Sequence, residues 1–234
     1  GVTPLELTAA YSAFANGGKY SKPYAVQKVM DSKGKTIKQF HPVQKETLSP
    51  QTAYIITMLL QDVVEKGTGQ QAKLPDRPVA GKTGTTSNYT NAWFIGYTPD
   101  LITTVWLGND RQEEPMVYQK GRIGSATASA LWKNYMTKVT KSRPVLDFTQ
   151  PPGIVWANVD PDTGRTVSGW FNRDSYKEVF AEDNVPRGRI QKIWHWLFSP
   201  AKKEAEEEEA PFPGETGATG DSPVISGEGK VSEY

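Results

Sequence analysis

Residues 79–99, "VAGKTGTTSNYTNAWFIGYTP", decide the fold because they hold two β-prone runs with a short polar turn between them. The runs at 78–86 and 91–99 are rich in β-branched and aromatic residues, and "SNYT" between them has the composition of a turn. A third run, "ITTVWLGND" at 102–110, follows directly. Connections this short favour antiparallel neighbours, so the sequence predicts a three-stranded antiparallel meander.

The residues before the meander predict two helices. Thr3 as N-cap and Glu6 three residues later form a capping box, Pro4 stands at the first helical position, and Asn16-Gly17-Gly18 ends the run. Ser49 and Pro50 begin a second helix in the same way, and Gly67 lies just past its end. The expected buried faces are Leu7, Ala10, Tyr11 and Phe14 in the first helix, and Ile56, Leu59, Leu60, Val63 and Val64 in the second.

A third helix is expected after the meander, in "SATASALWKNYMTKVTKSRP", with a stop at Pro144. Its expected buried face is Ala128, Leu131, Trp132, Tyr135 and Val139. Helices before and after an antiparallel meander indicate an α+β domain in which helices pack on the sheet.

Two further hairpins and a polar tail complete the expected organisation. "VQKVM" and "TIKQF", joined by "DSKGK", predict one hairpin at 26–40, and a second is expected to turn at residues 160–164. The proline-rich "DFTQPPG" suggests a boundary, after which come a short aromatic helix candidate and an acidic tail with the composition of a disordered segment. We therefore expect a main domain at 1–146, a small β module at 147–190, and the aromatic helix with the tail at 191–234.

The composition limits the classes of function. The net charge of +1 is uneven, because residues 201–234 hold 3 basic and 9 acidic residues and the first 200 hold 24 basic and 17 acidic ones. The absence of cysteine excludes thiol catalysis and zinc–thiolate sites, and no apolar run reaches the length of about 20 residues that a membrane span needs. No cofactor, metal or nucleic-acid partner is expected.

The segment Gly81-Lys82-Thr83 invites comparison with a phosphate-binding loop. Such a loop has a first glycine five residues before the Gly-Lys pair, but that position here is Asp76, a carboxylate that would repel phosphate. Pro75 and Pro78 also remove two amide donors from the would-be cradle. The residues after Lys82 are strand-like, so the helix dipole that would help bind phosphate is missing. The nucleotide-binding interpretation is therefore disfavoured.

A strand carrying Lys-Thr-Gly-Thr suits a serine acyltransferase that acts on peptides ending in a carboxylate. Strand alternation places Lys82 and Gly84 on one face and Thr83 and Thr85 on the other. Lys82 then supplies a cation near the nucleophile, Gly84 leaves room for the substrate, and the threonine hydroxyls can bind its carboxylate. The amide of Thr85 can point at a developing oxyanion.

The surrounding blocks make this match more specific than three letters alone. They are "GVTPLELTAAYSAFANGG", "VVEKGTG", "GKTGTT", "NAWFIGYTP" and "TTVWLGND". In this order they resemble the transpeptidase domain of class A (bifunctional) penicillin-binding proteins, whose signature motifs are Ser-x-x-Lys, Ser-x-Asn and Lys-Thr-Gly. The resemblance covers roughly residues 1–145 and implies a fold similar to the penicillin-binding protein transpeptidase and serine β-lactamase domains.

The resemblance implies a role for each residue of the Lys-Thr-Gly-Thr strand. Lys82 would tune the electrostatics of the nucleophile, Thr83 and Thr85 would contact the substrate carboxylate, and Thr85 N–H would complete the oxyanion hole beside Gly84. Trp93 and Gly96 look like packing residues. The implied partners are the peptidoglycan stem peptide, β-lactam antibiotics, and the upstream transpeptidase segment and glycosyltransferase domain of the same protein. The implied location is the extracellular face of the cell membrane, with the anchor outside this chain.

The nucleophile motif is missing from the expected place. Ser32-Lys33-Gly34-Lys35 and Ser199-Pro200-Ala201-Lys202 match Ser-x-x-Lys only formally, and Ser-x-Asn has no match. Tyr89-Thr90-Asn91 resembles a Tyr-x-Asn variant but follows Lys-Thr-Gly, which is the wrong order. We therefore expect the C-terminal part of a longer transpeptidase that is inactive alone. The alternative is a noncatalytic extracellular wall-binding or scaffold module. His41 and His195 are expected to be structural or surface residues.

Overall fold

The computed structural model describes residues 1–109, 114–119, 121–167 and 174–186. The described residues belong to one compact unit. The expected aromatic helix, the acidic tail, His195 and the match at Ser199 lie outside the described residues. Among the residues that are described, no helix is long and apolar enough to cross a membrane.

The first helix, α1 (Pro4–Ala15), begins at the predicted capping box. The Thr3 hydroxyl accepts from Glu6 N–H at 3.2 Å, and the Glu6 carboxylate accepts from Thr3 N–H at 2.8 Å. The Thr3 N–H bond to the Glu6 carboxylate and the Thr3 hydroxyl, which also donates to it at 2.9 Å, hold the pKa of Glu6 below its usual value. The helix ends where Gly17 and Gly18 take φ values of +60° and +93°, which L residues with a side chain rarely adopt.

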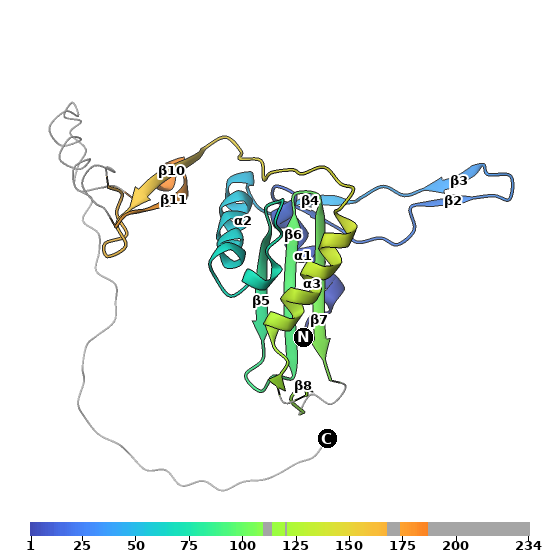
Figure 1. Cartoon of the computed structure of the whole chain (residues 1–234). Helices are drawn as coiled ribbons and strands as arrows, with labels where there is room; N and C mark the ends of the chain where they lie inside the picture. Colours follow the sequence, from blue (N-terminus) through green and yellow to red (C-terminus); the bar gives the residue numbers. More distant parts are fainter. Residues whose placement is uncertain (110–113, 120, 168–173, 187–234) are drawn as a thin grey trace, which may run out of the picture. The chain divides into compact units, whose positions relative to one another are not determined.

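The predicted meander is confirmed as the central sheet, drawn in green in Figure 1. Its strands β5 (Ala80–Thr85), β6 (Asn91–Thr98) and β7 (Leu101–Gly108) pair antiparallel in the order β5-β6-β7. The two- to five-residue connections leave no room for a crossover, which is why consecutive strands are neighbours.

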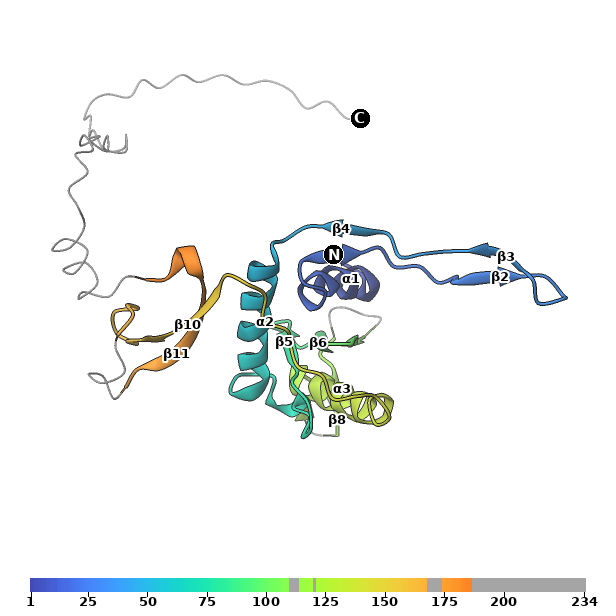
Figure 2. The same cartoon turned by 90° about the horizontal axis from the view of Figure 1, so that it is seen from above.

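Helices cover both faces of this sheet, as Figure 2 shows for α1 and α3 (Ser125–Val139). Two adjacent residues of β7 show that α1 and α3 lie on opposite faces, because neighbouring side chains of a strand point to opposite faces of the sheet. The Thr104 hydroxyl lies 2.5 Å from the Thr8 hydroxyl of α1. The Thr103 hydroxyl instead contacts Met136 of α3, and the Trp132 indole N–H donates to the Thr103 carbonyl at 3.0 Å. The predicted α+β fold with flanking helices is confirmed.

The main hydrophobic core lies between the sheet and α3. Phe94 and Trp132 are both fully buried, and their rings meet edge to face at 5.3 Å. Gly96 lies under the same tryptophan, since a Cβ there would stand 2.9 Å from the Trp132 ring. Gly96 is therefore a packing residue, and the close approach of α3 to β6 depends on its missing side chain. The buried members of this core are Val64, Ala72, Leu74, Val79, Phe94, Ala128, Trp132 and Met136.

The predicted helix faces are right in part. In α3 the buried side chains are Ala128, Ser129, Trp132 and Met136, whereas Leu131 and Tyr135 are exposed. The prediction followed the large apolar residues, but a 3.6-residue period centred on Trp132 selects Ser129 and Met136 instead. In α1 the predicted Ala10 is exposed, and Ala9 and Ala13 are the buried residues.

The second helix, α2 (Pro50–Glu65), starts as predicted with Ser49, whose hydroxyl accepts from Thr52 N–H at 3.1 Å. Its buried residues are Ala53, Thr57 and Val64, and the predicted Leu59 is exposed. Small residues face the sheet because α2 lies close against β5. Thr57 also reaches the fully buried Tyr97, whose hydroxyl lies 3.0 Å from its own, and burial raises the pKa of Tyr97.

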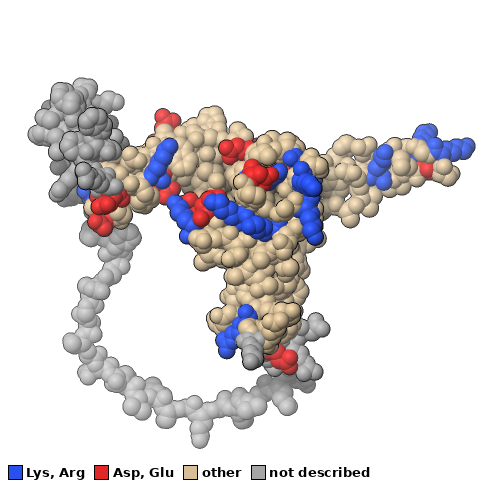
Figure 3. Space-filling model, in the orientation of Figure 1, with Lys and Arg blue, Asp and Glu red and all other residues tan. Residues whose placement is uncertain are grey.

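Residues 19–46 form a two-part antiparallel ribbon. The predicted hairpin is confirmed as β2 (Lys28–Met30) and β3 (Thr36–Gln39). The strands on either side of it, β1 (Lys19–Ser21) and β4 (Gln44–Glu46), also pair with each other, which was not predicted. The Asp31 carboxylate accepts from Lys33 N–H and Lys35 N–H and so closes the turn. Figure 3 shows the lysines that gather at this hairpin.

The second predicted hairpin has its turn at residues 160–164 as expected, but its first strand pairs mainly with a strand further along the chain. Asp160 accepts from Thr163 N–H at 2.9 Å and from Gly164 N–H at 2.9 Å, which builds the turn. The long partner of β10 (Ile154–Val159), however, is β11 (Tyr176–Ala181). Directly after the turn, Thr166 bridges back to Val159, and Val167 N–H donates to Asn158 O at 2.9 Å. The domain boundaries at 146 and 190 stay a proposal. The remaining elements are η1 (Gln70–Ala72), β8 (Val117–Tyr118), β9 (Gly121–Arg122) and η2 (Glu182–Asn184).

Candidate functional site

The Lys-Thr-Gly-Thr sequence lies on β5, at one edge of the central sheet. Thr86 N–H donates to Asn91 O at 3.1 Å, and the register Gly84↔Trp93 continues that pairing. Because ladder bonds alternate along an antiparallel strand, the main-chain groups of Thr83 and Thr85 point away from β6. The strand thus presents backbone donors and acceptors along its outer edge.

Lys82 and Gly84 share one face of β5, as the alternation predicted. They pair with Ile95 and Trp93 and line a pocket of about 650 Å³ beside α1. The Lys82 side chain is exposed, and its ammonium donates to the Thr83 carbonyl at 2.8 Å. Because the Thr83 carbonyl points away from β6, this bond places the Lys82 ammonium group at the outer edge of β5.

The hydroxyls of Thr83 and Thr85 have partners on other elements. Thr83 Oγ1 lies 2.7 Å from Thr68 Oγ1, in the loop that follows α2. Thr85 Oγ1 accepts from Ser125 N–H at 3.1 Å, at the first residue of α3. The α3 N-cap is Gly124, which has no side chain to cap the helix, so Thr85 satisfies one of the free amide donors there.

The pocket beside Lys82 is mostly apolar. Lys82 is the only charged side chain among the described residues that line it. The rings of Trp93 and Trp106 contact each other on one wall, with their centres 5.8 Å apart and a tilt of 38°, and the Trp106 indole N–H donates to the Asn91 side chain at 3.0 Å. Burial raises the pKa of the Tyr11 hydroxyl above its usual value. The lining residues are Gly1, Val2, Thr3, Pro4, Leu7, Tyr11, Lys82, Thr83, Gly84, Thr86, Asn91, Trp93, Ile95 and Trp106.

Thr86 fixes the end of the Lys-Thr-Gly-Thr strand. Its hydroxyl accepts from Thr90 N–H and Asn91 N–H, both at 3.0 Å. Tyr89, with φ of 57°, completes this turn, so Tyr89 and Thr90 lie in the turn between β5 and β6, and Asn91 is the first residue of β6. Sequence reasoning assigned no role to Thr86 or Thr68, because a hydroxyl that bonds across a turn or between two elements leaves no periodic signal.

The three glycines of this region differ in what they permit. A Cβ at Gly81 would stand 2.6 Å from the Phe94 ring, and Gly96 is equally closed. At Gly84 the nearest atom to a Cβ would be Trp93 Cβ, at 3.4 Å, which is ordinary contact. Close packing therefore requires glycine at positions 81 and 96, whereas the structure has room for an alanine side chain at position 84.

The other candidate residues lie away from this site. Ser32 and Lys35 belong to the exposed turn between β2 and β3, so this formal Ser-x-x-Lys match has no buried helix behind it. His41 is exposed. Across the described ranges, no group of three or more His, Cys, Asp or Glu side chains could hold a metal ion.

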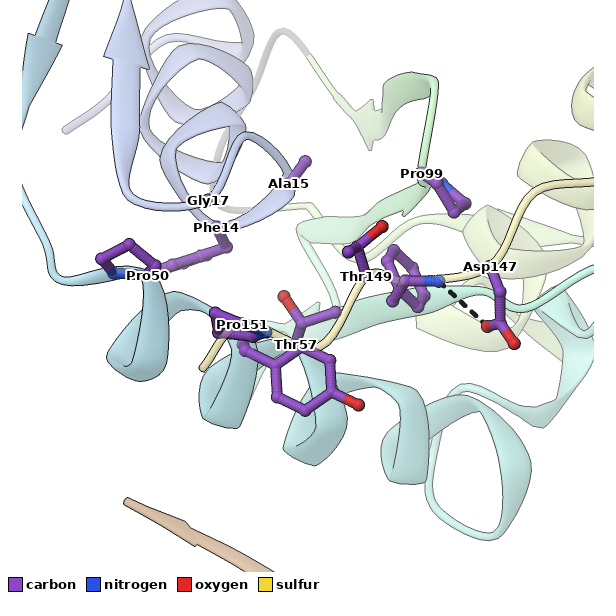
Figure 4. Close-up of a pocket in the computed structure, with 11 residues that line it drawn as sticks. Phe14, Ala15, Gly17, Pro50, Thr57, Pro99, Asp147, Thr149 and Pro151 are labelled. Carbon is purple, nitrogen blue, oxygen red and sulfur yellow. Dashed lines mark hydrogen bonds between the residues drawn. The ribbon is translucent and has the colours of Figure 1, made fainter. Parts of the chain in front are cut away.

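A smaller pocket of about 190 Å³ lies between the end of α1, the start of α2 and the segment 147–151. Figure 4 shows Phe14 and Pro50 on one side and Asp147 on the other, where the Asp147 carboxylate accepts from Phe148 N–H at 2.9 Å. It contains none of the residues predicted for the site.

These features define an α+β domain of the penicillin-recognising class, with a Lys-Thr-Gly strand at the sheet edge. The family model described as "Penicillin binding protein transpeptidase domain" matches residues 1–136. The chain therefore belongs to the penicillin-binding protein transpeptidase family, and its relatives are class A penicillin-binding proteins 1A.

Individual relatives agree with this assignment. The chain is 39% identical over 160 residues to penicillin-binding protein 1A of Aquifex aeolicus, which covers 68% of this chain and 22% of that protein. It is 30% identical to penicillin-binding protein 1A of Pseudomonas aeruginosa, with 79% and 28% covered. The chain thus spans about a quarter of the length of these relatives.

Solved structures show the same fold. The crystal structure of penicillin-binding protein 1A from Haemophilus influenzae superposes with a TM-score of 0.68 at 26% identity, covering 80% of this chain and 33% of that one. PonA1 from Mycobacterium tuberculosis, solved in complex with penicillin V, gives a TM-score of 0.56 at 28% identity, with 62% and 40% covered.

Proposed function

We propose that this chain forms one wall of the active site of a peptidoglycan D,D-transpeptidase and that residues outside it supply the serine nucleophile. The observation that carries the proposal is the exposed edge of β5, where Lys82 lines a pocket and the main chain of Thr83 and Thr85 points outward. Family membership supports the reaction type, and the missing Ser-x-x-Lys and Ser-x-Asn motifs support the division of the site. The parent protein would lie on the extracellular face of the cell membrane, with its anchor and a glycosyltransferase domain upstream.

In the proposed reaction the serine oxygen attacks the carbonyl of the penultimate D-alanine of a stem peptide. The bond to the last D-alanine breaks, its amine takes up a proton, and an ester joins the acyl chain to the enzyme. An amine of a neighbouring strand then attacks this ester, which restores the serine and completes the cross-link. A β-lactam acylates the same serine when its ring amide opens.

Each residue of β5 has a proposed role in this sequence. A stem peptide laid along the outer edge of the strand would meet the Thr85 N–H, which is directed away from β6 and is placed to donate to the oxyanion. Its terminal carboxylate would meet Lys82 on one side of the strand and the hydroxyls of Thr83 and Thr85 on the other. Gly84 would leave the substrate room to approach.

We expect that this chain alone forms no covalent adduct with a β-lactam. The described Ser-x-x-Lys match lies in an exposed turn, where its lysine remains solvated and cannot activate a serine. Mass spectrometry after incubation with penicillin G tests this, and a longer polypeptide that contains this chain and the preceding motifs is the positive control. A stoichiometric adduct on Ser32 or any other serine of the isolated chain would overturn the division of the active site.

We expect Gly84→Ala to lower acylation without destabilising the fold. The added methyl group fits beside Trp93 but enters the space proposed for the substrate. One misplaced methyl group in a binding site costs about 10- to 200-fold in kcat/KM, and the acylation rate constant of the longer polypeptide should fall by that order. Gly81→Ala is the matched control, because its Cβ meets the Phe94 ring and should lower the melting temperature instead. If the Gly84→Ala variant were acylated at an unchanged rate, the proposal that Gly84 leaves room for the substrate would be wrong.

A further inference from the structure

A threonine outside the Lys-Thr-Gly-Thr strand touches it from another element. Thr68 lies in the loop after α2, and its hydroxyl oxygen is 2.7 Å from that of Thr83, fifteen residues further along the chain. We propose that Thr68 is a positioning residue that orients the Thr83 hydroxyl toward the carboxylate of the substrate. This inference rests on the proposed transpeptidase function.

The backbone around Thr68 is held in place. Gly67 N–H donates to Asp62 O at 3.0 Å, and Gly69 N–H donates to Val63 O at 2.8 Å, so both neighbours of Thr68 bond to the last turn of α2. A Cβ at Gly67 or Gly69 would stand 2.9 or 3.1 Å from Val63 backbone atoms. The loop is therefore packed against the helix, and Thr68 projects from a fixed support.

The direction of the hydroxyl bond decides what Thr83 can offer a ligand. Each hydroxyl has one proton, and in the Thr68–Thr83 pair one oxygen donates while the other accepts. When Thr68 donates, the Thr83 oxygen acts as acceptor and its own proton stays free. A carboxylate only accepts hydrogen bonds, so its binding selects this direction.

Thr85 is arranged by the same principle. Its hydroxyl oxygen accepts from Ser125 N–H at 3.1 Å, which leaves the Thr85 proton available. Lys82 is the only charged side chain among the described residues that line the pocket, and none of these residues carries a carboxylate. Two hydroxyl protons and one ammonium group thus converge on the edge of β5, and the pair Thr68–Thr83 supplies one of them.

The test is Thr68→Val in the longer polypeptide that contains this chain, because valine keeps the shape of threonine and removes its donor. The pre-covalent dissociation constant for penicillin G should rise about threefold to tenfold, while binding of its neutral methyl ester should stay within twofold. Thr68→Ser keeps the donor and should restore binding. Thr8→Val is the matched control, since it removes a similar hydroxyl pair, with Thr104, on another face of the sheet.

A double-mutant cycle makes the test decisive. Thr83→Val and the Thr68→Val/Thr83→Val double variant should bind penicillin G equally, because Thr68 acts only through Thr83. The positioning role is wrong if the two effects add, if Thr68→Val leaves penicillin G binding unchanged, or if acid and ester weaken together. Failure of the unsubstituted polypeptide to be acylated would instead reject the proposed function itself.

Discussion

Replacing Lys82 with alanine in the longer polypeptide should cut the rate constant of penicillin acylation about 100-fold or more. Lys82 has the one charged side chain among the described residues that line the pocket, and its ammonium already lies at the edge where we place the substrate carboxylate. Loss of one group that stabilises charge in an acyl-transfer transition state costs about 10²- to 10³-fold in rate. Stopped-flow measurement of acyl-enzyme formation measures this effect.

The same substitution should leave the fold intact. The Lys82 side chain is exposed and pairs with no carboxylate of the described residues, so the melting temperature should change by no more than a surface substitution allows. Lys38→Ala, on the exposed β3, removes an equal charge far along the sequence and should leave acylation unchanged. Acylation by Lys82→Ala at the unsubstituted rate would contradict the role proposed for Lys82.

Trp132→Ala should have the largest effect on stability. The ring is fully buried against Phe94 and Gly96, and its N–H donates to the Thr103 carbonyl. Truncating a buried tryptophan leaves a cavity and costs about 3 to 5 kcal/mol, a large share of the total stability of a domain. Urea denaturation of this chain should show the loss as a lower midpoint.

Tyr135→Ala is the matched control on the same helix. Tyr135 is half exposed, and its removal should change the free energy of unfolding by about 0.5 kcal/mol or less. The two variants also test which face of α3 is buried, because the sequence pattern predicted Tyr135 and Trp132 on the same buried face, whereas the structure buries only Trp132 of the two. Equal losses in the free energy of unfolding for the two variants would favour the face predicted from the sequence over the one in the structure.

The sequence alone determined the local elements of this protein and the family to which it belongs. Capping residues such as Thr3 and Ser49, and the polar turn at 87–90, act on their immediate neighbours, so helix starts and the β5-β6-β7 meander follow from short stretches. The alternation of Lys82 and Gly84 with the two threonines is likewise a property of any strand. The resemblance carried by the five blocks was confirmed by the family match.

Only the tertiary structure decided which side chains meet. Burial of Ser129 and Met136 in place of Leu131 and Tyr135 depends on how α3 lies on β6, where Gly96 lets the Trp132 ring approach. The hydroxyl of Thr83 contacts that of Thr68, 15 positions away along the chain, and the hydroxyl of Thr85 accepts from Ser125 N–H, 40 positions away. The pairing of β10 with β11 likewise joins strands that are not connected by a short turn. A local pattern cannot specify such contacts, because their energy arises only when packing of the whole domain brings distant elements together.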